Sequence, residues 1–346
     1  MNDLKYLMAY TIPLVTLFSL IFKGSFSYAT LIYAFLFIPV LELLLKSKSE
    51  NYKEKEVVQR LHNRVFDWML YLNIPFVFLL LFYGMIILNT ASISQFERVG
   101  LLLSLGVLLG TNGINVAHEL GHRKSRIEKT MSKFLLLPSL YMHFFIEHNY
   151  GHHKNVATSE DPATAKKGQS LYLFWITSVL RQYRNAWRVQ LKLLNAKETS
   201  FFSLKNDMLF YLIFQLGYLG SLYFLFGGEG VFFGIIIAVI SFLLLETINY
   251  VEHYGLVRKK INGRYERVKP IHSWNSDHVV GRIVLYELTR HSDHHYRASK
   301  KYQILESKKE SPKLPFGYPS SMLIALIPPL WFRVMNRELQ SFNKIQ

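Results

Sequence analysis

The chain has 346 residues, of which 50% are hydrophobic and 15% aromatic, and it carries a formal charge of +16. It contains no cysteine, which excludes disulfides, thiolate metal ligands and cysteine-held iron–sulfur clusters. The apolar residues are gathered in long unbroken blocks, as in membrane proteins. Beside such blocks, the excess of positive charge favours an anionic lipid surface or an acidic protein partner over nucleic acid.

Six stretches without Lys or Arg predict membrane-spanning helices, so the expected fold class is an all-α polytopic membrane protein. Most of them approach the ~20 residues that cross a hydrocarbon layer ~30 Å thick. The first is expected to be retained, because Lys5 and the apolar run after it lack the small-residue cleavage site of a secretory signal. The six predicted spans are residues 7–22, 27–45, 68–88, 99–117, 208–226 and 231–250.

The positive charges divide unevenly between the two sides of this predicted bundle. Of the 40 Lys and Arg residues, only Lys23 and Arg98 fall in the short links that join the spans in pairs. By the positive-inside rule, the opposite side faces the cytoplasm together with both termini. The expected organisation is one membrane-embedded domain over residues 1–346, with spans one to four in 1–117, a cytoplasmic segment in 118–207, spans five and six in 208–250 and a second cytoplasmic segment in 251–346.

Further helices are expected in stretches that are too short, too polar or too rich in proline to cross a membrane. They are a re-entrant or interfacial helix over residues 134–145, surface helices over 170–180 and 183–194, a helix over 283–288 that leads into the last histidine cluster, and an interfacial stretch over 322–332. Two acidic residues in or near the predicted spans, Glu42 and Glu246, are expected to be functional or to reach for the interface.

Nine of the 13 histidines occur in four short clusters. Spacings of i, i+3, i+4 or i, i+4, i+5 place the imidazoles of a cluster on one face of a helix. In the predicted topology every cluster lies at or just inside the cytoplasmic interface, so we expect all nine to meet at one metal centre. They are His118 and His122 in the first cluster, His148, His152 and His153 in the second, His253 in the third, and His291, His294 and His295 in the fourth.

The first cluster, His-Glu-Leu-Gly-His over residues 118–122, also fits the H-E-x-x-H helix of zinc peptidases, with Glu119 as the general base. A membrane zinc protease is therefore an alternative, but it uses three histidines and leaves six unexplained. A zinc site takes four ligands at most. Nine imidazoles suit two ions with four or five nitrogen ligands each, of the iron or copper type that reacts with dioxygen.

Polar side chains beside the histidines are expected to form an outer layer that orients the rings. They are Glu119, Glu147, Asn249, Glu252 and Asp293. An ordinary charge on a helix surface is the alternative for each carboxylate. The four remaining histidines are expected to be structural or to belong to this outer layer, and they are His62, His143, His272 and His278.

The four motifs HELGH, EHNYGHH, NYVEHYG and RHSDHH, in this order, closely resemble those of the integral-membrane alkane 1-monooxygenases, which belong to the membrane fatty-acid desaturase and hydroxylase superfamily. The strings DPAT at 161–164, IHSWNSDH at 271–278 and GYP at 317–319 resemble the same family. Two histidine motifs alone would also fit membrane desaturases and sterol or xylene hydroxylases. The third and fourth motifs together with HSWNS are more specific to the alkane branch.

This resemblance implies two non-haem iron ions held by the nine clustered histidines. It also implies that one oxygen atom of O2 enters a terminal C–H bond of an n-alkane, giving a 1-alkanol, with electrons that come from NAD(P)H through a flavin-dependent reductase and rubredoxin. Because this chain has no cysteine, rubredoxin must dock from outside. The candidate docking residues are cations close to the clusters, for which the positive-inside rule is the alternative explanation, and they are Lys124, Lys154, Arg297, Lys300 and Lys301.

The resemblance further implies an apolar substrate channel between the spans, in a protein of the bacterial inner membrane. Ala34 matches the place in the second span where a bulky residue of this family blocks the far end of the channel. A small residue there implies that longer alkanes are accepted, whereas ordinary packing of a small residue between helices is the alternative. A fatty-acyl desaturase or hydroxylase of the same superfamily is the main alternative function.

Overall fold

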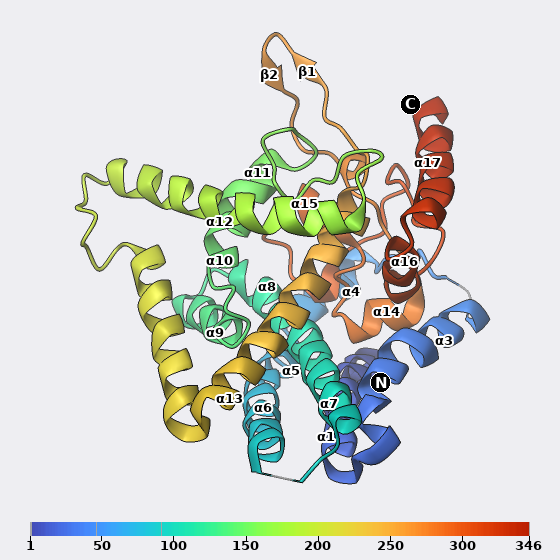
Figure 1. The fold of residues 1–346 in the computed structure, drawn as a ribbon. Coiled ribbons are helices and arrows are strands. Elements are labelled where there is room, and N and C mark those ends of the chain that lie inside the picture. The colour runs from blue at the N-terminus through green and yellow to red at the C-terminus, as the bar shows by residue number, and fades with distance from the viewer. Residues whose placement is uncertain (1, 46, 91, 346) are drawn as a thin grey trace. The chain divides into compact units, whose positions relative to one another are not determined.

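The computed structural model describes residues 2–45, 47–90 and 92–345. These residues are mostly helical, with one two-stranded antiparallel ribbon in the described part of the chain (Figure 1). The predicted helical class is therefore confirmed. In chain order the elements are η1 (Asn2–Tyr10), α1 (Thr11–Phe22), η2 (Gly24–Tyr28), α2 (Ala29–Ile32), η3 (Tyr33–Phe37), α3 (Ile38–Leu44), α4 (Glu54–His62), α5 (Val65–Tyr71), α6 (Asn73–Thr90), α7 (Gln95–Leu108), η4 (Leu109–Ile114), α8 (Asn115–Gly121), α9 (Arg126–Leu136), α10 (Phe144–Ile146), η5 (Glu147–His152), α11 (His153–Asn155), α12 (Leu171–Asn195), α13 (Asp207–His253), β1 (Lys260–Ile261), β2 (Arg264–Tyr265), η6 (Pro270–His272), α14 (Val279–Val284), α15 (His291–Tyr296), η7 (Tyr302–Ile304), α16 (Tyr318–Ala325) and α17 (Pro328–Ile345).

The chain divides into two compact units, and each is described by itself. The first unit contains the residues up to Phe37 together with Val65–Glu147 and Tyr183–Leu245. The second unit contains Ile38–Arg64, His148–Gln182 and the residues from Glu246 onward. The predicted division into membrane and cytoplasmic segments of one domain stays a prediction.

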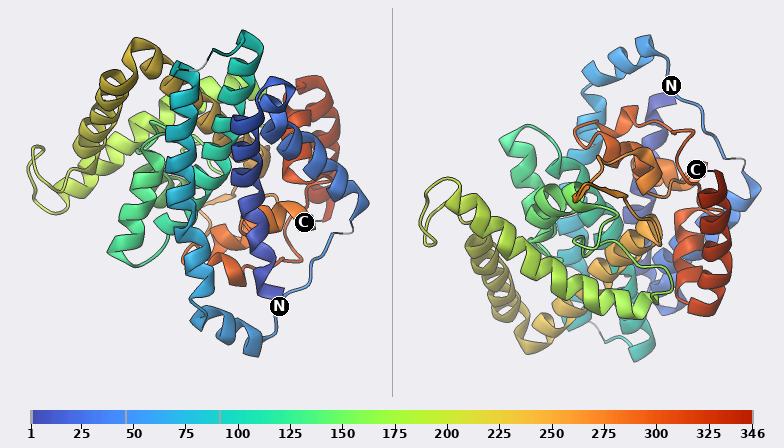
Figure 2. Two further views of the ribbon diagram at one scale, coloured as in Figure 1. Left: turned by 90° about the horizontal axis from the view of Figure 1, so that it is seen from below. Right: turned by 90° about the horizontal axis from the view of Figure 1, so that it is seen from above.

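In the first unit, helices α1, α6 and α7 pack side by side, as the blue and teal rods in the left view of Figure 2 show. A buried amide joins α6 to the segments that adjoin α1 and α7, because Nδ2 of Asn112 in η4 donates to the carbonyl of Ala9 in η1 at 3.0 Å and to Oδ1 of Asn73 in α6 at 2.8 Å. Gly106 allows α7 to approach α13 closely, since a Cβ atom there would lie 2.4 Å from the side chain of Ile240. Small residues at such crossings are typical of packed membrane helices.

Within the described residues, five helices are long and apolar enough to cross a membrane. They are Asp3–Phe22, Gly24–Leu44, Val65–Thr90, Gln95–Gly121 and Asp207–His253. The first four contain most of the first four predicted spans and extend several of them. This supports a multi-pass membrane protein.

The fifth of these helices, α13, covers both the fifth and the sixth predicted spans. With 47 residues, a straight α-helix would be about 70 Å long, more than twice the ~30 Å hydrocarbon layer. Instead, Gly227 has φ 68° and ψ −163°, a conformation that a glycine adopts without steric cost. Figure 1 shows α13 as two gold rods that meet at a sharp bend. The count of six crossings stays a prediction. If the chain reverses its direction at Gly227, the two halves of α13 provide the fifth and sixth crossings.

Two predictions for the segment between the fourth and fifth spans are wrong. The apolar stretch 134–145 is not one helix, because α9 ends at Leu136 and Leu140 has φ 51°. Pro138 follows α9 closely and has no backbone N–H with which to continue the helical hydrogen bonding. The two predicted surface helices over 170–180 and 183–194 are one continuous helix, α12.

Two further predicted stretches are also interrupted. The helix expected over 283–288 stops at Val284, and Tyr286 and Glu287 have φ values of 51° and 57°. These left-handed residues turn the chain before α15. The apolar stretch 322–332 spans the end of α16 and the start of α17, which begins at Pro328. Proline favours the first turn of a helix because its fixed φ suits that position and it needs no N–H bond there.

An aromatic core in the second unit holds the end of α13. Trp331 of α17 lies with its ring centroid 5.4 Å from that of Tyr250 and 5.5 Å from that of Tyr254. Nε1 of buried Trp274 donates to the carbonyl of Tyr254 at 2.9 Å. Burial of such large rings contributes strongly to stability. It fixes the helix end on which His253 stands.

Glu42 joins three elements of the second unit. Its side chain is buried at the end of α3, and Oε1 accepts a hydrogen bond from the backbone N–H of Gly281 at 2.9 Å. Its other oxygen lies close to Gly317, which precedes α16. Negative charge near helix N-termini is favourable. This contact favours a structural role for Glu42 over the interfacial one left open by the sequence.

Candidate metal centre

Helix α15 presents three of the predicted ligands. It comprises six residues, and His291, His294 and His295 are all buried. The expectation that this cluster is helical is confirmed. The i, i+3, i+4 spacing turns the three imidazoles toward one side of the helix.

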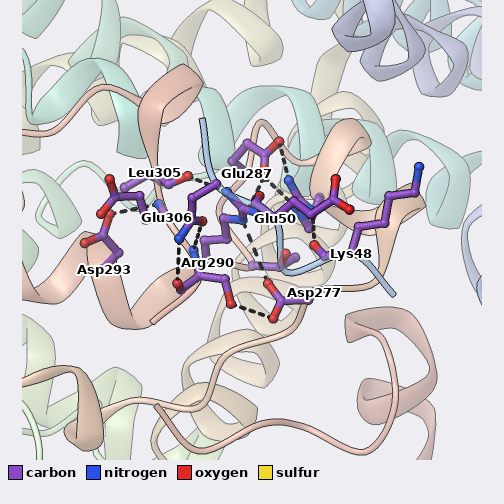
Figure 3. A network of polar contacts seen from close by, with 12 residues as sticks. Lys48, Glu50, Asp277, Glu287, Arg290, Asp293, Leu305 and Glu306 are labelled. Carbon is purple, nitrogen blue, oxygen red and sulfur yellow. Dashed lines mark hydrogen bonds and ion pairs between the residues drawn. The ribbon is translucent and has the colours of Figure 1, made fainter. Parts of the chain in front are cut away.

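A network of polar contacts fixes the start of α15 (Figure 3). The guanidinium of fully buried Arg290 donates to the carbonyl of Leu305 at 2.6 Å and to the carbonyl of Glu50 at 2.8 Å. It also lies 3.5 Å from the carboxylate of Glu287 and 3.8 Å from that of Asp277. Residues far apart in the sequence are thereby tied to the residue that precedes the first histidine of α15.

Arg282 extends the same network from α14. Its Nε atom lies 2.7 Å from Oε2 of Glu287, and its Nη1 atom donates to the carbonyl of Lys48. Glu287 therefore accepts from one buried arginine and lies beside a second. Buried charges of opposite sign that are also hydrogen-bonded hold a geometry well.

The second histidine cluster lies on a π-helical turn, η5. In such a turn, residues five apart come together, and π turns are frequent at functional sites. Accordingly, the Nε2 atoms of His148 and His153 lie 3.0 Å apart. The ring of His152 does not join this pair, and its Nε2 atom lies near that of His295 instead. The i, i+4 register expected for an α-helix is therefore replaced by an i, i+5 pair.

Four buried histidines of the second unit converge from three different segments. Their ligand nitrogens all lie within 4.8 Å of one another. The Nε2 atoms of His152 and His295 are 3.2 Å apart, and those of His253 and His291 are 3.1 Å apart. We call His152, His253, His291 and His295 the four-histidine cluster.

Three more histidines of the second unit form a neighbouring group. Nε2 of His153 lies 3.0 Å from Nε2 of His148 and 3.1 Å from Nε2 of His294. We call these residues the three-histidine group. Seven of the nine predicted ligands are thus brought together within the second unit.

These distances fit metal coordination. Imidazole nitrogens bound ~2.1 Å from one ion are separated by about 3.0 Å in octahedral and about 3.4 Å in tetrahedral geometry. A single metal ion can bind all four nitrogens of the four-histidine cluster at once, whereas a hydrogen bond between two imidazoles joins only two of them. The donor set, all neutral nitrogen, suits a transition metal rather than Mg²⁺ or Ca²⁺.

Burial keeps these imidazoles in the form that binds a metal. Burial lowers the pKa of His294 and of His295 well below the ordinary value, and neighbouring histidines add to the effect. Both rings are therefore neutral near pH 7. A neutral imidazole offers a lone pair without first releasing a proton.

Asp161 is a site residue that the sequence analysis did not assign. Its buried Oδ2 atom lies 2.9 Å from Nδ1 of His152 and accepts a hydrogen bond from Oγ1 of Thr164. A proton held on Nδ1 by a carboxylate leaves Nε2 free for a metal. The available signal was the DPAT string nine residues after His152, which had been noted only as a family resemblance.

Glu252 is placed differently from the expected ring-orienting role. Its Oε2 atom lies 3.1 Å from Nε2 of His291, the nitrogen that also faces His253. Its Oε1 atom accepts a hydrogen bond from the hydroxyl of Tyr318 at 2.7 Å. The carboxylate thus faces the interior of the four-histidine cluster. Tyr318 lies in the GYP string, whose role the sequence left open.

Asp293 contacts lysines rather than a histidine. Its fully buried carboxylate lies 2.7 Å from Nζ of Lys300 and 3.4 Å from Nζ of Lys308, and it accepts from the backbone N–H of Glu306. It holds the loop after α15 against that helix. Lys300, which was expected to dock a partner, is therefore engaged internally, whereas Lys124, Lys154 and Arg297 are exposed and Lys301 is partly buried.

Asn249 and Glu246 belong to a separate polar group in the second unit. Nδ2 of Asn249 donates to Oε1 of Glu246 at 3.4 Å. Oε2 of Glu246 accepts from the hydroxyl of Ser178 at 2.7 Å, and both of its oxygens lie 2.8 Å from Nε2 of Gln182. This buried carboxylate therefore ties α12 to α13.

The first unit contains the two remaining predicted ligands, His118 on α8 and His122 directly after it. The ring centroids of His118 and His122 are 4.9 Å apart, as expected for an i, i+4 pair. Glu119 accepts from Arg123 at 2.9 Å, and Arg123 also contacts Asp67 at 3.0 Å. The ion pairs anchor the helix end that carries both histidines.

Glu147 and His143 are also buried in the first unit. Oε1 of Glu147 accepts from Nδ2 of Asn185 at 3.0 Å. The His143 ring lies against Tyr141 and Tyr183, with centroids 4.2 and 5.2 Å away. Burial lowers the pKa of His143 to about 3, so its ring is neutral.

The other three histidines lie outside the two groups of converging nitrogens. His62 is exposed, with Nδ1 2.8 Å from the carbonyl of Val58. Burial lowers the pKa of His272 to about 4, and its Nε2 lies 3.4 Å from Glu266. Nδ1 of His278 lies 3.0 Å from the hydroxyl of Ser276. These contacts are consistent with structural roles.

The fold and the clustered imidazoles define a class of multi-pass membrane metalloproteins with histidine ligands. Comparison with known proteins places the chain within it. The fatty acid desaturase family matches residues 97–321. The chain is 37% identical over 316 residues to alkane 1-monooxygenase 1 of Alcanivorax borkumensis and 38% identical over 317 residues to the alkane 1-monooxygenase of Pseudomonas putida, in both cases covering 89% of this chain and 78% of the relative. It is 29% identical over 277 residues to the xylene/toluene monooxygenase hydroxylase component of Pseudomonas putida, covering 78% of this chain and 72% of that protein.

The chain therefore belongs to the alkane monooxygenase family, and it is a membrane-bound oxidoreductase of the monooxygenase type. The resemblance predicted from the four histidine motifs is confirmed.

Proposed function

We propose that the protein hydroxylates the terminal methyl group of medium- and long-chain n-alkanes to 1-alkanols, using O2 and two iron ions. The observation that carries this proposal is the convergence of seven imidazoles, six of them buried and that of His153 partly buried, in a chain whose relatives are named alkane 1-monooxygenases. The nine predicted histidine ligands would hold both ions. The four-histidine cluster would hold one of them.

Iron would supply the oxidising power for a C–H bond that no side-chain acid or base can break. The chain itself would supply position and protection. Neutral buried imidazoles present their nitrogens without a proton to displace, Asp161 fixes the ring of His152, and the surrounding apolar core excludes water. An alkane dissolves in the hydrocarbon layer, so a membrane helix bundle is a suitable place to receive it.

Electrons would come from rubredoxin, itself reduced by a flavin-dependent NAD(P)H reductase. With no cysteine in 346 residues, this chain has no thiolate iron centre of its own. The net charge of +16 suits an acidic donor. The distribution of Lys and Arg supports an inner-membrane location with both termini and the metal centre on the cytoplasmic side.

A second candidate is desaturation or hydroxylation of fatty-acyl chains or aromatic methyl groups. The match to the fatty acid desaturase family and to a xylene/toluene hydroxylase component favours it. A membrane zinc protease has less support, because its helix would use His118 and His122 and leave the four-histidine cluster without a role.

Product analysis tests the proposal. The purified protein would be supplied with NADH, rubredoxin reductase, rubredoxin, isotopically heavy O2 and a medium-chain alkane. We expect a 1-alkanol that carries the heavy oxygen atom. Formation of an alkene or a hydroxylated acyl chain from an acyl substrate, with the alkane unchanged, would replace the alkane by the second candidate.

Chain-length selection provides a further prediction. Ala34 is buried in the π turn Tyr33–Phe37 of the second candidate span. If this side chain borders the far end of the channel, Ala34→Trp should lower activity on the longest accepted alkanes by about tenfold or more, because an indole fills space that the substrate needs. Activity on shorter alkanes should persist. The measurement is the product yield across an alkane series.

The control is Ile32→Trp, because Ile32 lies on the same segment with an exposed side chain. It should leave the length profile unchanged. Equal profiles for Ala34→Trp and the wild type would assign Ala34 to ordinary helix packing.

A further inference from the structure

A hollow of about 190 Å³ opens in the second unit beside the four-histidine cluster. The charged residues of its lining are basic apart from Asp161, the residue that holds the ring of His152. The lining includes Thr158, Asp161, Lys166, Lys167, Arg181 and Val257. One hydrogen bond of 2.9 Å therefore separates the wall of this hollow from a predicted metal ligand.

A short β-hairpin borders the hollow. Strands β1 and β2 are joined by Asn262 and Gly263, whose φ values are 49° and 79°. Positive φ at both central positions gives the twist of a tight hairpin turn. The orange ribbon of the hairpin extends away from neighbouring elements of its unit in Figure 1.

The exposed surface of the hairpin carries several positive charges. Four exposed cations have no carboxylate partner among the described residues, and they are Lys259, Lys260, Arg264 and Arg267. The one acidic residue of the hairpin, Glu266, is bound internally. A hydrogen bond from Lys269 lowers the pKa of Glu266 to about 2. The carboxylate is therefore ionised and paired with Lys269.

Two exposed aliphatic side chains accompany these charges. Val257 at the rim of the hollow is 75% exposed, and Ile261 on β1 is 58% exposed. Apolar contacts surrounded by polar and charged groups are typical of protein interfaces.

The hairpin is rigidly attached to the segment that carries His152 and His153. Buried Arg258 donates to the carbonyls of Lys154 and Val156 at 2.8 and 3.2 Å, and to the carbonyl of Glu266 at 2.7 Å. The backbone N–H of Arg258 bonds to the carbonyl of Ala157 at 2.7 Å. A partner that binds the hairpin is therefore held at a fixed position relative to the hollow and to Asp161.

We propose that the hairpin and the adjoining hollow form the docking site for a small acidic one-electron carrier, and that electrons enter the metal centre through Asp161 and His152. This rests on the proposed function, which requires an external donor. In each encounter the carrier is oxidised by one electron. Two encounters deliver two electrons, and water supplies two protons. With these, one alkane and one O2 give one alkanol and one water.

An anionic lipid surface is the other chemistry that could attract these cations. The acidic protein is favoured for two reasons. The hairpin is anchored to the ligand-bearing segment rather than to a candidate span. The hollow beside it leads to a carboxylate bonded to a metal ligand, an arrangement that a lipid headgroup does not require.

The test is the affinity of the full-length protein in nanodiscs for purified rubredoxin, measured as a binding isotherm at several salt concentrations. The variant is the triple charge reversal Lys259→Glu, Lys260→Glu and Arg264→Glu. Its control is Arg184→Glu, Arg188→Glu and Lys192→Glu, which makes the same change of charge on exposed residues of α12. We expect the hairpin variant to bind about tenfold or more weakly at low salt, with the difference shrinking as salt rises, and the control to bind within about threefold of the wild type.

Equal affinity of the hairpin variant and the wild type would overturn the docking site while leaving the proposed function intact. A wild-type protein that forms 1-alkanol but does not bind rubredoxin would remove the proposed donor, and the docking site with it. If the hairpin variant binds rubredoxin normally but loses the stabilisation that phosphatidylglycerol gives the wild type over phosphatidylcholine, the surface belongs to lipid and the proposal is wrong.

Discussion

His253→Ala is expected to reduce the iron content of the purified protein from about two ions per chain to about one, and to abolish measurable hydroxylation. His253 is fully buried at the end of α13, and its Nε2 atom lies 3.1 Å from that of His291. Its loss removes one of four converging nitrogens and leaves a cavity in the place of its ring. The fall in activity should exceed the ~10–100-fold cost of losing a group that only orients a ligand.

The measurements are metal analysis and alkanol yield on the same preparation. His62→Ala is the matched control, because His62 is an exposed histidine outside both groups. It should keep its iron and its activity. A His253→Ala protein that retains two irons and full activity would show that the four-histidine cluster does not hold a metal.

Arg290→Met is expected to destabilise the protein by about 3–5 kcal/mol, the usual cost of removing one partner from a buried ionic network. The substitution leaves the carboxylates of Glu287 and Asp277 without one of their neighbouring cations, and the carbonyls of Glu50 and Leu305 lose their guanidinium donor (Figure 3). Because Arg290 directly precedes His291, the start of α15 should loosen and the protein should also retain less iron.

Thermal unfolding in detergent, followed by circular dichroism, measures the first effect, and metal analysis measures the second. Arg337→Met is the control, since Arg337 is exposed on α17. It should change stability by less than about 0.5 kcal/mol. An Arg290→Met protein that unfolds and binds iron like the wild type would mean that the network is not needed to hold α15.

The sequence predicted the features of this protein that depend on local pattern. Apolar blocks predicted the membrane helices because a spanning helix must be apolar along its whole length. Histidine spacing predicted the helical face of α15, since His291, His294 and His295 lie within one and a half turns. The four motifs together predicted the family.

Features that depend on tertiary contacts or unusual backbone were not predictable in the same way. The π turn at Glu147–His152 pairs His148 with His153, although the sequence allows an α-helical register equally well. Tyr286 and Glu287 adopt left-handed conformations although neither is a glycine, so the sequence gives no sign of a turn there. They are maintained by the surrounding contacts, including the bonds of Glu287 with Arg282.

The partners of the carboxylates were the least predictable part of the site. Asp293 was expected to orient a histidine because it stands beside His294, but it points to Lys300 and Lys308. Asp161 lies nine residues from His152 and reaches it only because the intervening chain folds back. Proximity in sequence says little about where a short side chain points when the chain leaves a helix.

The most direct test of the account is a count of metal ions in the purified wild-type protein. Two clusters of imidazoles predict about two iron ions per chain and no stoichiometric zinc. One zinc ion per chain without iron would contradict the account, because it would make the HELGH segment a peptidase helix and leave the four-histidine cluster without a metal.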